Sequence, residues 1–161
     1  MKTPWETELA SLLNDLLAVQ DRLLEILAKK RELLIASDGE GLATIAPQEE
    51  QLIGELQQCM VRREALLKQA DQAGMPSASI KALTEALPKD QRSELKEQVH
   101  QAGSRARLLR HHSLTNWVVI QRTLIHLSQM IEIIATGGRL QPTYGKGEPV
   151  SASGSLVDHA A

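Results

Sequence analysis

The sequence predicts an all-α fold: an antiparallel bundle of three long helices with short helical connectors and a disordered C-terminal tail. Apolar residues make up 42% of the 161 residues, enough for a core, but aromatic residues make up only 2% and phenylalanine is absent. A core of aliphatic residues suits helices better than a β-sandwich, in which aromatic and β-branched residues dominate. Apolar residues also recur at alternating intervals of three and four, which is the period of a packed helix.

The first helix has a well-marked start and end. Thr3 and Glu6 fit a capping box, with Pro4 at the first helical position. A leucine-rich stripe runs over residues 9–34, and the turn-forming residues 37–39 follow it. We therefore expect one long helix that ends just before residue 37.

The middle of the chain is divided by prolines and glycines. We expect a short helical connector over residues 40–46, after which Pro47 either breaks or kinks the helix or opens the next one. The second long helix carries an apolar stripe over residues 52–67 and stops at Gly74 and Pro76. Residues 77–87 predict a second short connector.

The third long helix starts after Pro88, and we expect it to end near Thr136, where Gly137 and Gly138 supply a stop. It carries a heptad seam of more than five repeats from Leu95 to Ile134. Apolar periodicity vanishes afterwards. We therefore expect a helical bundle domain over residues 1–140 and a flexible tail over residues 141–161.

The second half of this seam is wider than packing against one neighbour requires. These apolar residues either fill the bundle core or form a groove for a helix of another protein, and we favour the groove. Asn116 lies on the seam, where it either sets the register of a buried contact or hydrogen-bonds a bound segment. The candidate partner-binding residues are Asn116, Trp117, Ile120, Leu124, Leu127, Ile131 and Ile134.

Two columns make up the candidate surface. Trp117, Leu124 and Ile131 form the column that is the better candidate for an outward partner. The neighbouring column of Ile120, Leu127 and Ile134 is compatible with facing the bundle.

Composition and motifs argue against catalysis. No phosphate-binding loop, paired cysteines or metal-binding histidine motif is present, so we expect no enzyme activity, no metal and no cofactor. Cys59 is the only cysteine, and we interpret it as a buried structural thiol. The basic cluster Arg105, Arg107, Arg110, His111 and His112 indicates a solvated face or a partner contact rather than nucleic-acid binding.

Charge and hydropathy predict a cytoplasmic protein. The net charge of -2 gives no general attraction to nucleic acid or an anionic membrane. We see no signal peptide, and no run reaches the roughly 20 apolar residues of a membrane span. We therefore expect no membrane insertion.

Three segments together resemble the FlgN-type flagellar export chaperones. The first is Asn116-x-x-x-Ile120-x-x-x-Leu124-x-x-Leu127 with the aliphatic residues up to Ile134, and the second is the ending Thr143-Tyr144-Gly145-Lys146-Gly147. Residues 63–67, Arg-Glu-Ala-Leu-Leu, resemble the middle region of the family. The chain departs from the family in its serine-, alanine- and glycine-rich tail after Gly147 and in its unusually aliphatic 117–134 stretch.

The resemblance implies a type III secretion chaperone. Such a protein binds the C-terminal helices of flagellar hook-associated proteins, which form the hook–filament junction, and delivers them to the export gate. It would hold this cargo on its last helix and touch the gate through a tyrosine, which by position is Tyr144. The competing hypothesis is a structural coiled-coil or helical-bundle adaptor, including a homodimer in which the stripe pairs with itself. The sequence leaves the cargo, the stoichiometry and the oligomeric state open.

Overall fold

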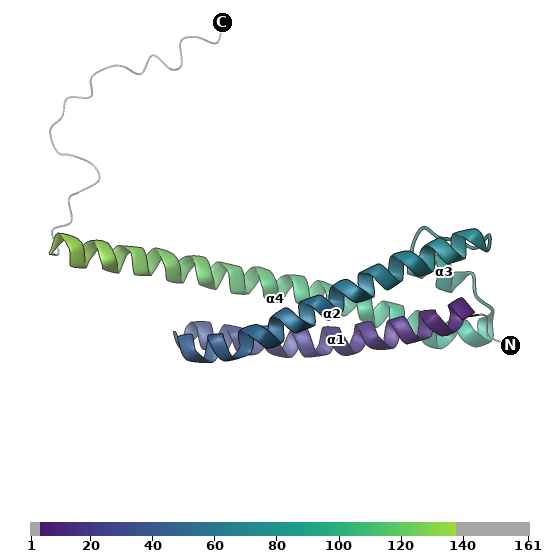
Figure 1. The fold of residues 1–161 in the computed structure, drawn as a ribbon, viewed down its shortest axis with the longest axis horizontal. Helices are drawn as coiled ribbons and strands as arrows, with labels where there is room; N and C mark the ends of the chain where they lie inside the picture. The colour runs from purple at the N-terminus through teal and green to yellow at the C-terminus, as the bar shows by residue number, and fades with distance from the viewer. Residues whose placement is uncertain (1–3, 138–161) are drawn as a thin grey trace, which may run out of the picture. The chain divides into compact units, whose positions relative to one another are not determined.

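The computed structural model describes residues 4–137, and within them the regular elements are four α-helices (Figure 1). Helix α1 spans Pro4–Ile35, α2 spans Gly39–Gln72, α3 spans Ile80–Glu85 and α4 spans Lys89–Thr136. The predicted all-α class with three long helices is confirmed. Thr3 of the expected capping box and the 140/141 domain boundary lie outside the described residues.

Side-chain pairs between the helices show how they run. Lys30 of α1 contacts Glu49 of α2, and Arg22 of α1 contacts Glu55 of α2. Residue numbers in these pairs therefore increase along one helix as they decrease along the other. Helices α1 and α2 are therefore antiparallel. Between α1 and α4 the residue numbers increase together, because Asn14 pairs with Gln98 and Leu27 pairs with Asn116. Helix α4 thus runs parallel to α1, as an up-down-up bundle requires.

The start of α2 differs from the prediction. Residues 40–46 are not a separate connector but the first turns of α2, and Pro47 lies inside this helix. The Asp38 side chain caps the helix by accepting a hydrogen bond from the Gly41 amide at 2.9 Å. Ile45 and Leu52 are buried on either side of the proline, and Ala43, whose carbonyl loses its usual Pro47 partner, is exposed to water. Packing and hydration together offset the missing hydrogen bond.

Two clusters of buried side chains hold the bundle together, and leucine dominates both. One joins α1, α2, α4 and the segment between α3 and α4. The other joins α1, α2 and α4 nearer the α1–α2 turn. Their buried members are Leu9, Leu12, Leu13, Cys59, Leu66, Leu87 and Leu95 in the first cluster, and Leu23, Leu27, Leu52 and Leu109 in the second.

Glycines with positive backbone angles mark two helix ends. Gly74 has φ +72° just after α2, and Gly137 has φ +64° just after α4. A residue without a Cβ adopts this left-handed conformation at little cost, which explains why both helices stop at glycine. The predicted stops after α2 and near Thr136 are confirmed. The expected connector at 77–87 is helical only over Ile80–Glu85.

The chain divides into two compact units, residues 1–121 and residues 122–161. The first unit contains α1, α2, α3 and the first part of α4. The described part of the second unit, residues 122–137, contains only the last turns of α4.

Candidate partner-binding surface

The buried side chains of α4 form one column with a seven-residue period. Leu95, Ala102 and Leu109 are each 8% exposed, and Asn116 is 3% exposed. No residue of α4 after Asn116 is buried. The heptad seam of the sequence thus continues to Ile134, but Asn116 is the last buried residue on it.

Asn116 is held by α1 through hydrogen bonds at both ends of its side-chain amide. Its Nδ2 donates to the Leu27 carbonyl at 2.9 Å, and its Oδ1 accepts from the Nε of Arg31 at 3.4 Å. This buried position favours the interpretation that Asn116 sets the register of α4 on α1. We therefore leave Asn116 out of the partner surface, although its sequence position first suggested it.

Arg31 links Asn116 to His112. The Arg31 guanidinium lies 2.5 Å from Nδ1 of His112, which must accept this hydrogen bond because arginine only donates. Desolvation lowers the pKa of His112, and its electrostatic interactions with the Arg31 guanidinium and with His111 lower it further. The neutral imidazole is therefore the form that fits this contact.

Sequence reasoning missed the α1 partners of α4. Gln20, which is buried, donates from Nε2 to the carbonyl of Ala102 at 3.1 Å, and Asp21 pairs with Arg105. Nothing in the sequence around Gln20 and Asp21 indicates that these polar residues contact another helix. The predicted basic cluster is correspondingly divided, because Arg105 and His112 face α1 while Arg110 is exposed.

The predicted surface residues other than Asn116 are exposed or partly exposed. In the first unit, Trp117 is 59% exposed and Ile120 is half-buried. In the second unit, all four predicted residues are exposed: Leu124 (53%), Leu127 (47%), Ile131 (66%) and Ile134 (77%). Both predicted columns therefore meet solvent from residue 124 onward.

The same stretch exposes further apolar side chains, so it is apolar on more than one side. These residues are Leu114, Val118, Ile125, Met130 and Ile133. Contiguous exposed apolar surface of this kind marks a contact with a protein or a membrane. Scattered single apolar residues, such as Val61 on α2, need no such explanation.

Among the described residues, α4 alone has the length and apolar composition that a membrane-crossing helix needs. This differs from the expectation that no segment would qualify, because the stretch is apolar enough overall although Arg122 and Glu132 interrupt it. Charged residues in the hydrocarbon region are costly and rare. The composition of α4 by itself is weak evidence for a span.

The described residues offer little for metal chemistry. Residues 4–137 contain no group of three or more histidine, cysteine, aspartate or glutamate side chains placed to hold a metal ion. Tyr144 lies outside the described residues.

Comparison with known proteins gives one match. The family model described as FlgN protein matches residues 1–148. The curated proteins and the solved structures that were compared give no match. FlgN is a family of chaperones with a general role in flagellar export. Because the match extends over most of the 161 residues, the chain belongs to the FlgN family.

Proposed function

We propose that this protein is a cytoplasmic chaperone that holds flagellar hook-associated proteins on the apolar stripe of α4 and delivers them to the export gate. We define the apolar stripe as Trp117, Ile120, Leu124, Leu127, Ile131 and Ile134. The observation that carries the proposal is the exposure of large aliphatic side chains over this part of the helix.

The stripe suits an amphipathic helix as its ligand. Its residues recur at intervals of three and four, so they share one side of α4. A cargo helix that pairs only in the assembled filament exposes a complementary stripe beforehand. Joining the two stripes removes apolar surface from water, which contributes about 25 cal/mol per Å² before the costs of ordering are subtracted.

The test replaces two residues of the outward column. The double variant Leu124→Asp/Ile131→Asp should stay folded, because both side chains are more than half exposed and surface changes usually cost little. It should lose binding of a purified hook-associated protein in titration calorimetry, because each carboxylate would be buried in the apolar contact. Thermal unfolding followed by circular dichroism checks the fold.

The matched control places the same charges on another helix. Ile53→Asp/Val61→Asp alters two exposed aliphatic residues of α2, which are 43% and 66% exposed, and should leave cargo binding unchanged. Unfolding of the Leu124/Ile131 variant would show that these residues belong to a core. Its conversion from dimer to monomer in analytical ultracentrifugation, with cargo binding retained, would favour the homodimeric adaptor instead.

Delivery to the gate is proposed through Tyr144, and it rests on the family resemblance. Tyr144→Ala should leave cargo affinity unchanged and reduce export of the cargo in cells, while Tyr144→Phe should export more than the alanine variant because it keeps the ring. Normal secretion by the alanine variant would remove Tyr144 from the proposal.

A further inference from the structure

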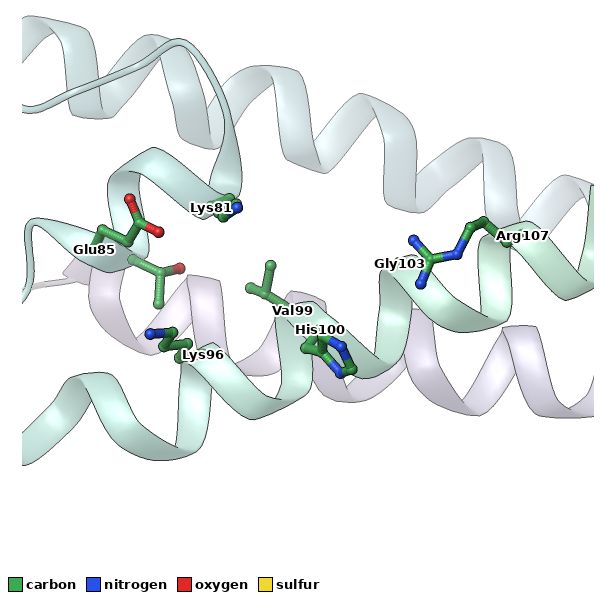
Figure 2. Close-up of a pocket in the computed structure, with 8 residues that line it drawn as sticks. Lys81, Glu85, Lys96, Val99, His100, Gly103 and Arg107 are labelled. Carbon is green, nitrogen blue, oxygen red and sulfur yellow. The ribbon is translucent and has the colours of Figure 1, made fainter.

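A separate cleft of 380 Å³ lies between α3 and α4 in the first unit (Figure 2). Its volume is at the lower end of the range of ligand pockets, about 300–1,000 Å³, so it suits a few side chains rather than a whole helix. Val99 of α4 points into the cleft, and Gly103 leaves its floor open. Thr84 of α3 and His100 of α4 also line it. None of these residues belongs to the apolar stripe.

The rim of this cleft is basic. Lys81 on α3 and Lys96 and Arg107 on α4 line it, against one carboxylate, that of Glu85. In the described part of the chain, none of these four side chains takes part in a salt bridge. Three cations and one anion give the rim a local charge of +2, opposite in sign to the net charge of -2 of the chain. The rim therefore attracts negative groups.

The floor is apolar and continues into the bundle. Val99 and Gly103 also line a second cleft of 230 Å³, whose other walls include Leu16, Ile80 and Ala102. A Cβ added to Gly103 would meet only the Arg107 Nη1 atom, at 3.9 Å. The small residues of α4 thus leave room beside α3 that an aliphatic side chain fits.

We propose that this basic cleft binds a short acidic segment of a partner protein. An aliphatic side chain of the segment enters over Val99 and Gly103, and its carboxylates pair with Lys81, Lys96 and Arg107. Charge complementarity selects the acidic residues, and the apolar floor selects a peptide over a free phosphate, which would leave that floor uncovered. The proposal does not depend on the proposed function, because the two surfaces share no residue.

In the experiment, the full chain is added to a fluorescently labelled peptide in which pairs of glutamates alternate with pairs of leucines. The Leu124→Asp/Ile131→Asp substitutions are present throughout, so that leucines of the peptide do not collect on the apolar stripe. We expect saturable binding by fluorescence anisotropy together with shifts of the Val99 methyl resonances. Peptides with lysine for glutamate, or with serine for leucine, should bind about tenfold more weakly or not at all.

Two pairs of matched variants locate the binding. Lys81→Glu/Lys96→Glu should weaken the glutamate–leucine peptide about tenfold or more, whereas Lys29→Glu/Lys68→Glu, with the same change in charge on exposed positions of α1 and α2, should not. Gly103→Leu should fill the floor and weaken the peptide too, while Gly54→Leu on α2, where a Cβ also meets open space, should not.

Three results would overturn the proposal. Absence of binding is the first, and equal binding by both lysine-pair variants is the second. Equal binding of the serine peptide, with full competition by inorganic phosphate, is the third and would leave a simple anion site. Leucine has a higher helix propensity than glycine, so Gly103→Leu should remain folded. This variant therefore still tests the proposal if Lys81→Glu/Lys96→Glu unfolds the protein.

Discussion

Replacing Asn116 by alanine should loosen the attachment of α4 to α1. The side chain is 3% exposed and makes a 2.9 Å hydrogen bond to the Leu27 carbonyl and a 3.4 Å contact with Arg31. The first bond contributes about 1 kcal/mol. The second exceeds the usual 2.7–3.2 Å range and contributes less, but its loss leaves a partly buried guanidinium with one partner fewer. We expect a total loss of about 2 kcal/mol.

The matched control is Asn14→Ala on α1. Asn14 is exposed and accepts one hydrogen bond, from Gln98 at 2.8 Å. Both substitutions replace asparagine by alanine inside a helix, so the gain in helix propensity, at most about 0.7 kcal/mol, is common to both. The difference between the two variants therefore measures how much more the buried Asn116 contributes with its two contacts than the exposed Asn14 with its one hydrogen bond.

Urea unfolding followed by circular dichroism measures this difference. With about 4 °C per kcal/mol for a domain of this size, Asn116→Ala should also melt about 8 °C below the unsubstituted protein, and Asn14→Ala should melt between the two. Cargo affinity of Asn116→Ala should be unchanged, because the side chain faces α1. Equal unfolding midpoints for the two variants would refute the conclusion that Asn116 attaches α4 to α1. Loss of cargo binding without loss of stability would return Asn116 to the partner surface.

Two further predictions concern titratable groups. The lowered pKa of His112 means that its contribution to stability is fully present above about pH 6.5 and is lost as the pH falls through the lowered pKa. His112→Gln, which keeps an acceptor for Arg31 but does not titrate, should show a flatter dependence of the urea midpoint on pH; an unchanged dependence would contradict this. Burial raises the pKa of the Cys59 thiol, while the nearby Arg62 opposes this rise, so iodoacetamide should label native protein far more slowly than urea-unfolded protein. Equal labelling rates would show that Cys59 is open to solvent.

Much of the architecture follows from periodicity and turn chemistry in the sequence. The three-and-four spacing predicted three long helices because it places apolar residues on one side of each helix. Gly74 and Gly137 predicted helix ends because a left-handed backbone suits glycine. The asparagine–leucine pattern and the tyrosine-containing ending predicted the family, which the match over residues 1–148 confirmed.

Pro47 shows where local rules failed. Its missing N–H predicted a break, a kink or the start of a new helix, yet α2 continues through it because Ile45 and Leu52 are buried on either side. The sequence shows that proline costs the helix one hydrogen bond, but it does not show the packing that offsets this cost. Only the tertiary structure shows both the lost hydrogen bond and the packing.

The division of α4 was also beyond the sequence. Heptad spacing places Leu109, Asn116 and Leu127 on related faces of one helix, but it does not say which of them another helix covers. The structure buries Leu109 and Asn116 against the bundle and leaves Leu127 47% exposed. Periodicity specifies which side chains share a face, whereas burial depends on which distant segment of the chain packs against them. Asn116 pairs with α1 near the end of that helix, and the last residue of α1 is Ile35.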